Sequence, residues 1–103
     1  INMKIAITSE GNSLESKMDN RFGRCAYFAI YDTGTKTTDF FANPARDASD
    51  GAGPKAVEFI ASKGVTKVVA SELGGKAKAI LDRLNIKMQQ ENDKTVADII
   101  KQL

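Results

Sequence analysis

The stretch Asp19-Asn20-Arg21-Phe22-Gly23-Arg24-Cys25-Ala26-Tyr27-Phe28 organises the rest of this 103-residue sequence. It holds the only cysteine of a chain without histidine, and its two arginines flank a glycine. The apolar run from Cys25 to Tyr31 is typical of a β-strand. One soft ligand and two fixed cations at a loop-to-strand junction point to an anion or metal–sulfur site. The alternative is that Cys25 is a small hydrophobe packed at the start of the strand.

Four further runs of apolar residues predict strands on either side of this stretch. They cover residues 3–8, 36–42, 65–71 and 86–88. Polar connections at 9–20 and 43–50 are long for a small domain, and long connections of this kind are usually functional or mobile. The short turn at 32–35 makes the strands on either side of it a hairpin.

Three helices are predicted from their caps and their apolar spacing. The first is expected to have Gly53 as its cap, Pro54 as its first residue and Gly64 as its left-handed stop. The second opens at Gly74-Gly75, and its apolar stripe extends to Leu84. In the third, Thr95 and Asp98 are spaced as in a capping box. The resulting order is β-β-β-α-β-α-β-α, and one domain over residues 3–103 is expected.

This order predicts an α/β fold with a five-stranded mixed sheet in which the second strand is antiparallel. The helix-linked strands should be parallel, with right-handed crossovers. The ends of the strands at 3–8, 36–42 and 65–71 then share one edge with Cys25 and the glycines at 51, 53, 74 and 75. Ligands bind at this edge in open α/β sheets, and helix N-termini there favour anions. The plainer alternative is that these glycines only serve caps and turns.

Composition and missing motifs exclude several functions. A net charge of +2 without a basic, aromatic-rich block argues against nucleic acid, and no apolar run is long enough to cross a membrane. A single cysteine suits a reducing compartment, so we expect a cytoplasmic protein. Ile1 and Asn2 precede Met3 and are expected to be an expression remnant outside the fold.

Catalytic motifs are also absent from the sequence. Gly75-Lys76 is followed by Ala77 instead of the Ser or Thr that a phosphate-binding P-loop needs. Without histidine the chain has no Ser-His-Asp or Cys-His nucleophile and no zinc ligand set. The strand at 3–8 carries no carboxylate for a two-metal nuclease. We therefore expect a protein that is not an enzyme.

Several segments in this order resemble the dinitrogenase iron–molybdenum cofactor biosynthesis family, which includes NifX-like and NafY-like proteins and the C-terminal part of NifB. They are Met-Lys-Ile-Ala-Ile-Thr (3–8), Arg-Phe-Gly-Arg-Cys-x-Tyr-Phe (21–28), Gly-Ala-Gly-x-x-Ala (51–56), Lys-Gly-Val (63–65), Gly-x-x-Ala (74–77) and Ile-Lys (86–87). The resemblance spans Met3 to Leu103. It implies a ribonuclease-H-like, three-layer α/β/α fold without nuclease chemistry. Some members have histidine just before Phe-Gly, where this chain has Arg21, which leaves Cys25 as the only soft ligand.

The resemblance implies a small carrier for an iron–sulfur, iron–molybdenum or related metal–sulfide cluster, bound reversibly between donor and acceptor proteins. Nearby cations are expected to ease ionisation of the Cys25 thiol, so that it could ligate one metal. Two other hypotheses remain: an interaction domain with Cys25 merely packed, and a sensor of small anions or nucleotides. The predicted binding residues are Arg21, Gly23, Arg24, Cys25, Gly51, Gly53, Gly74 and Gly75, with Cys25 as the metal ligand.

Overall fold

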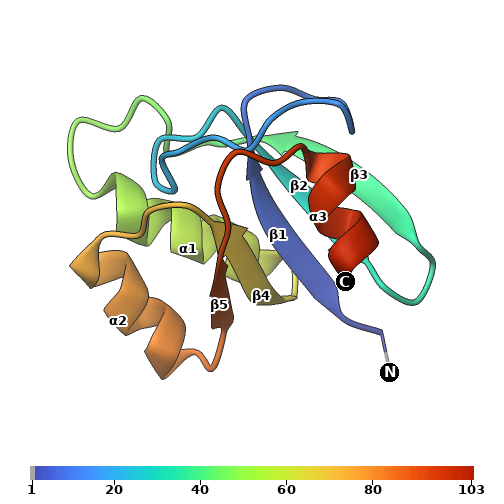
Figure 1. The fold of residues 1–103 in the computed structure, drawn as a ribbon. Helices are drawn as coiled ribbons and strands as arrows, with labels where there is room; N and C mark the ends of the chain where they lie inside the picture. Colours follow the sequence, from blue (N-terminus) through green and yellow to red (C-terminus); the bar gives the residue numbers. More distant parts are fainter. Residues whose placement is uncertain (1) are drawn as a thin grey trace.

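A computed structural model describes residues 2–103; Ile1, which was expected to precede the fold, lies outside the described residues. The described part of the chain forms five strands and three helices, whose arrangement is shown in Figure 1. Their bounds are β1 (Lys4–Ser9), β2 (Tyr27–Asp32), β3 (Thr37–Ala42), α1 (Ala52–Ser62), β4 (Val65–Ala70), α2 (Gly75–Arg83), β5 (Lys87–Gln90) and α3 (Val96–Gln102). The predicted order of elements is confirmed.

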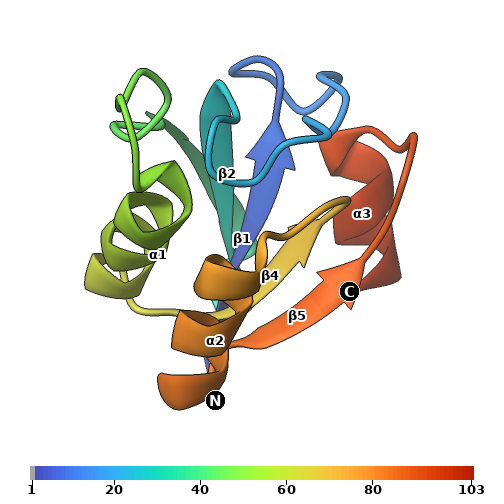
Figure 2. The ribbon, with the colours of Figure 1, turned by 90° about the vertical axis from the view of Figure 1, so that its left-hand side faces the viewer.

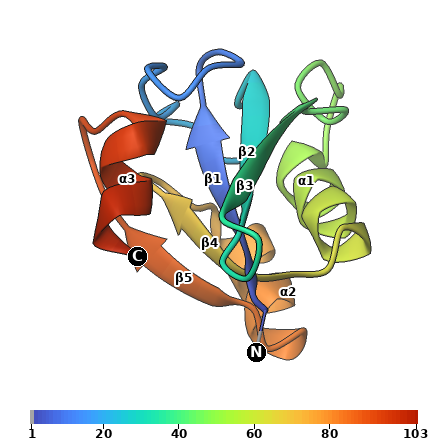
Figure 3. The same cartoon turned by 90° about the vertical axis from the view of Figure 1, so that its right-hand side faces the viewer.

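The strands form one mixed sheet in the order β3-β2-β1-β4-β5. The strand β2 is antiparallel to both β1 and β3, whereas β1, β4 and β5 are parallel, as predicted. Helices α1 and α2 cover one face of the sheet and α3 covers the other, which gives the three-layer α/β/α arrangement (Figures 2 and 3).

The central strand β1 separates two apolar cores. Its alternating side chains place Ala6 in the core with α1 and α2, and Ile5 and Ile7 in the core with α3. Both cores contain residues of β4, because that strand is also covered on its two faces. The sheet is therefore a fixed platform, and the loops at its edge are positioned by elements buried on both sides.

The first helix begins earlier than predicted. Its N-cap is Gly51, and Pro54 is the third helical residue instead of the first. Gly51 has φ +65°, a left-handed conformation that glycine adopts without strain, so the chain can turn directly into the helix there. The left-handed stop at Gly64 is confirmed, with φ +80°.

Other boundaries also differ from the sequence prediction, most of them by a single residue. Cys25 and Ala26 precede β2 instead of opening it, because the chain there bonds to loop residues. β5 is displaced toward Gln90. Leu84 was expected to be in the stripe of α2, but it is 48% exposed because it lies at the C-cap, beyond the helix. The Thr95–Asp98 capping box of α3 is confirmed.

Candidate functional site

The loop that follows β1 and the two segments that lead into α1 and α2 meet at one edge of the sheet (Figure 2). Two adjoining hollows at this edge form what we call the open pocket. One, of about 280 Å³, is lined by Arg21, Phe22, Gly23, Arg24, Ala52, Gly53, Glu72, Gly74 and Ala77. The other, of about 290 Å³, is lined by Gly51, Ala52, Gly53, Pro54, Gly74, Gly75, Lys76 and Ala77. All predicted binding residues except Cys25 lie in one or both linings.

Two glycines of the pocket lie where a side chain would be crowded, Gly23 against backbone and Gly53 against the Ala77 side chain. A Cβ at Gly23 would lie 2.8 Å from the amide nitrogen of Gly53, so the loop can approach the start of α1 only without a side chain. A Cβ at Gly53 would lie 3.3 Å from the Cβ of Ala77, which shows how closely α1 and α2 approach each other. These contacts hold the loop and the two helix N-termini together.

Gly74 and Gly75 have a different environment. A Cβ at either position would meet nothing within 4 Å, and Gly74 has φ −67°, which any residue adopts. Neither packing nor backbone strain therefore explains why these two positions are glycine. The consequence of the missing side chains is an unobstructed approach to the N-terminus of α2.

The N-termini of α1 and α2 face the open pocket without caps. Their N-cap residues, Gly51 and Gly74, make no side-chain cap bond, and neither first turn contains an acidic residue. The exposed ends of such helices carry unpaired N–H groups and a partial positive charge, which favour anions. Lys76 adds a full positive charge to the second hollow, whose lining holds no carboxylate.

The N-terminus of α3 is closed. The amides of Val96 and Ala97 donate to the carbonyls of Ser16 and Leu14, each at 2.9 Å. The side chain of Thr95 accepts from the amide of Asp98 at 3.1 Å. We call residues 14–18 and 94–98 the closed end. Here backbone carbonyls of the loop from 9 to 20 accept hydrogen bonds from the first amides of α3.

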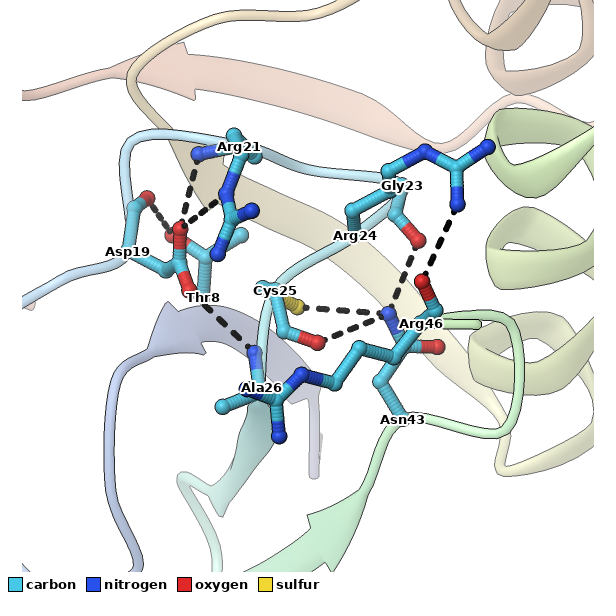
Figure 4. A network of polar contacts seen from close by, with 9 residues as sticks. All are labelled: Thr8, Asp19, Arg21, Gly23, Arg24, Cys25, Ala26, Asn43 and Arg46. Atoms are coloured by element: carbon cyan, nitrogen blue, oxygen red, sulfur yellow. Dashed lines mark hydrogen bonds and ion pairs between the residues drawn. The ribbon is translucent and has the colours of Figure 1, made fainter. Parts of the chain in front are cut away.

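Asp19 organises the segment that carries the two arginines (Figure 4). Its Oδ1 accepts from the backbone amide of Arg21 at 3.0 Å and from Nε of Arg21 at 3.3 Å, and its Oδ2 accepts from the amide of Ala26 at 3.2 Å. Thr8 Oγ1 donates to the Asp19 carbonyl at 2.9 Å, which ties the segment to the end of β1. Asp19 is buried, and these donors satisfy the hydrogen-bonding capacity of its carboxylate oxygens.

Asn43 fixes the other half of the same segment. Its Nδ2 donates to the carbonyls of Gly23 and Cys25 at 2.9 and 3.0 Å, and it lies 3.6 Å from the Cys25 Sγ. Arg24 Nη1 donates to the carbonyl of Arg46 at 3.1 Å, so the loop after β3 is joined to the arginine segment twice.

Cys25 lies behind the pocket and not in it. Its residue is 0% exposed, and it lines neither hollow. Burial, followed by the charge of Asp19, raises the pKa of the Cys25 thiol from 9.0 to about 12. The expectation that nearby cations ease ionisation of this thiol is therefore wrong, because burial and the negative charge of Asp19 both oppose formation of the thiolate. A metal-ligand role for Cys25 stays a prediction.

Sequence reasoning missed three residues around the pocket: Asp19, Asn43 and Glu72. The Asp-Asn-Arg and Asn-Pro sequences are turn signals that could have indicated Asp19 and Asn43 as loop organisers. Glu72 lies between the predicted strand at 65–71 and Gly74, so the predicted topology already places it at this edge, and a parallel bridge between Arg21 and Glu72 brings it into the pocket lining. Glu72 makes the first hollow less positive than the two arginines alone predict.

The next question is whether side chains of the described residues could ligate a metal ion directly. No group of three or more Cys, Asp or Glu side chains in residues 2–103 is placed to hold a metal ion. The open pocket instead offers amides and cations, which suit an anion that brings its own metal ligands. As for membranes, none of the helices described is both long and apolar enough to span one.

Known proteins resemble this chain over nearly its whole length. The uncharacterised protein MJ0580 of Methanocaldococcus jannaschii is 29% identical over 102 residues, which cover 96% of this chain and 83% of that protein. The apo form of the orange protein (ORP) from Desulfovibrio gigas matches with a TM-score of 0.91 and 31% identity, covering 97% of this chain and 85% of that one.

A third similar protein has a solution structure. It is a candidate NifB protein from Thermotoga, of the DUF35 family, and its NMR structure matches with a TM-score of 0.84 and 36% identity over 96% of this chain and 84% of that one. The family model described as dinitrogenase iron–molybdenum cofactor matches residues 3–103. From this match and the shared fold, the chain belongs to the dinitrogenase iron–molybdenum cofactor family.

Proposed function

We propose that this protein is a non-catalytic carrier that binds a metal–sulfide cluster reversibly at the open pocket. The cargo class is an iron–sulfur, iron–molybdenum or molybdenum–sulfur cluster, or a precursor of one. The observation that carries the proposal is the convergence of two uncapped helix N-termini and two arginines on one hollow edge, in a chain of the iron–molybdenum cofactor family.

The chemistry of the pocket supports an anion that arrives with its ligands in place. Metal–sulfide clusters are usually anionic, and their sulfur atoms accept hydrogen bonds from amide and guanidinium groups. The amides at the starts of α1 and α2, with Arg21, Arg24 and Lys76, supply such donors. Gly51, Gly53, Gly74 and Gly75 let the cluster approach the backbone.

Few bonds from protein to metal favour rapid release, which a carrier needs. In the proposed complex the cluster keeps its own ligands, and Cys25 supplies at most one bond after a local opening of the 22–25 segment. Donor and acceptor proteins of cluster assembly are the proposed partners, in a reducing cytoplasm. The comparison with the orange protein supports this proposal, since that relative is named as an apo form.

The test is anaerobic addition of tetrathiomolybdate, or of a cluster donor, to the purified protein. The proposal predicts a new visible absorbance that co-elutes with the protein and a rise in melting temperature. Phosphate and nucleotides serve as competing anions. No absorbance and no thermal shift with any sulfido-metal anion would overturn the proposal, whereas protection by nucleotides alone would favour the sensor hypothesis.

The role of Cys25 is tested separately with Cys25→Ala. If the thiol is a metal ligand, this variant binds the same anion with a changed spectrum and a markedly higher Kd. If the thiol is packed behind the pocket, the spectrum of the bound anion stays the same. Either result leaves the carrier proposal intact and assigns the residue.

A further inference from the structure

The two arginines of the open pocket have unequal electrostatic environments. Arg21 Nε lies 3.3 Å from Oδ1 of Asp19, in an ion pair whose carboxylate side chain is only 6% exposed. The Asp19 carboxylate has no other cation within 4.0 Å among residues 2–103, so its charge is directed at Arg21. The pair joins this buried carboxylate to a guanidinium side chain that is 60% exposed, so it offsets the charge of Arg21 without enclosing the side chain.

Arg24 has no such partner. Its Nη1 donates to a neutral acceptor, the carbonyl of Arg46, and none of the ion pairs of the described chain includes it. The remaining N–H groups of its guanidinium are available to a ligand. Figure 4 shows Arg24 extending away from Asp19, on the side of the loop that carries Arg46. The positive charge of Arg24 at the pocket lining is therefore not offset by an ion-pair partner within residues 2–103.

From this asymmetry we infer that Asp19 sets the charge of the pocket: it offsets part of the charge of Arg21, so that Arg24 is the main side chain that recognises an anionic guest. This inference rests on the proposed function, because it assigns roles within the same pocket. Asp19 is a positioning residue, since it lines a neighbouring hollow but does not line the open pocket.

The carboxylate of Asp19 also discriminates among guests. A guest that reaches the Arg21 guanidinium must compete with a buried, intramolecular carboxylate that already bonds its Nε, and that also bonds the backbone amide of the same residue. Glu72, in the same lining, adds a second negative charge. Binding therefore favours an anion that can contact Arg24 and the amides of α1 and α2 together, and disfavours one that approaches from the side of Arg21.

The test compares Arg24→Gln, Arg21→Gln and Arg83→Gln, with tetrathiomolybdate as the probe. Arg83 lies at the opposite end of α2, so its variant controls for the loss of one positive charge. Arg24→Gln should raise the Kd about tenfold or more, as the loss of one charge-assisted hydrogen bond predicts. Arg21→Gln should raise it about threefold or less while lowering the melting temperature, because it leaves the Asp19 carboxylate without its ion-pair partner.

Two conservative variants give readouts that a merely structural role would not produce. Arg24→Lys should restore part of the lost affinity, since it returns the charge. Asp19→Asn should tighten binding by a few-fold, because Arg21 then becomes free to contact the anion. If Asp19→Asn does not fold, the comparison of the Arg21 and Arg24 variants decides the question alone.

The outcomes separate this inference from the proposed function. Wild-type binding with equal losses in Arg21→Gln and Arg24→Gln, or with the larger loss in Arg21→Gln, overturns the inference and leaves the carrier proposal standing. Failure of the wild-type protein to bind any sulfido-metal anion overturns both.

Discussion

The open pocket and the closed end lie at the same edge of the sheet but treat their helix N-termini in opposite ways. At the closed end, α3 has a capping box, and the carbonyls of Ser16 and Leu14 bind its first amides. At the open pocket, α1 and α2 begin at glycines without a side-chain cap. The same fold thus supplies hydrogen-bond acceptors to the first amides of α3 but none from a side-chain cap to those of α1 and α2, which lie together at the pocket. This difference supports our proposal that the open N-termini bind a guest.

The largest expected effect concerns Cys25, which the structure places behind the open pocket. Burial raises its pKa to about 12 from 9.0, so the folded state holds the proton of the thiol longer than the unfolded chain does. Stability from this thiol is complete below pH 9 and is lost as the pH rises through about 12, by up to about 4 kcal/mol. Urea unfolding at pH 8 and pH 10.5 should show a steeper loss in the wild-type protein than in Cys25→Ala, which lacks the thiol and so controls for other titrating groups. Equal losses would mean that the thiol is open to solvent.

A second prediction breaks the contact between the arginine segment and α1. Gly23→Ala puts a Cβ 2.8 Å from the Gly53 amide nitrogen, so backbone must move, at a cost of about 1–3 kcal/mol. Chemical denaturation should show this loss together with weaker binding of tetrathiomolybdate. Gly75→Ala is the matched control, because a Cβ there meets nothing within 4 Å. A Gly23→Ala variant as stable as Gly75→Ala would contradict the close approach.

A third prediction converts an open N-terminus into a closed one. Gly74 has extended backbone angles that suit an N-cap residue, so Gly74→Asp can cap α2 with its own carboxylate. The variant should gain a few tenths of a kcal/mol in stability yet lose about tenfold in affinity for tetrathiomolybdate, because the carboxylate occupies the anion's place. Gly74→Asn introduces a neutral capping side chain, so comparing it with Gly74→Asp separates the repulsion of the anion by negative charge from the blocking of its place by a side chain. If Gly74→Asp bound tetrathiomolybdate with unchanged affinity, the N-terminus of α2 would not be part of the binding site.

The smallest effect on binding is expected at the closed end. Thr95→Ala removes the side chain that accepts from the Asp98 amide and should cost about 1 kcal/mol of stability. Affinity for tetrathiomolybdate should stay at the wild-type value, since the α3 terminus is occupied by the protein itself. A change in affinity comparable to that of Gly74→Asp would erase the distinction between the two regions.

The sequence predicted the platform better than the details of the site. Hairpin and crossover rules determined that β2 is antiparallel and that Gly51, Gly53, Gly74 and Gly75 share an edge, since strand direction follows from connection type alone. The start of α1 was misplaced because Pro54 is tolerated throughout the first turn and not only at its first position. Both features depend on short stretches of sequence, so they can be predicted from the sequence to within a few residues.

The charge of the site could not be predicted in the same way. Arg21 and Arg24 look equivalent in the sequence, and only the fold shows that Asp19 bonds one of them while Arg46 offers a neutral carbonyl to the other. Likewise, the buried Cys25 is bonded at its carbonyl by Asn43, which lies 18 residues away along the chain. The Asp19–Arg21 contact is local, but the bonds of Arg24 to Arg46 and of Asn43 to Cys25 join distant parts of the chain and leave no periodic signal.

The central claim is that an anionic guest binds the uncapped starts of α1 and α2. The most direct measurement is an NMR titration of the labelled protein with tetrathiomolybdate under anaerobic conditions, following the backbone amides. The account predicts saturable shifts at Ala52, Gly53, Gly75, Lys76 and Ala77, with Val96, Ala97 and Asp98 unchanged. Shifts centred on the α3 amides, or none at the starts of α1 and α2 while the anion is bound, would contradict it.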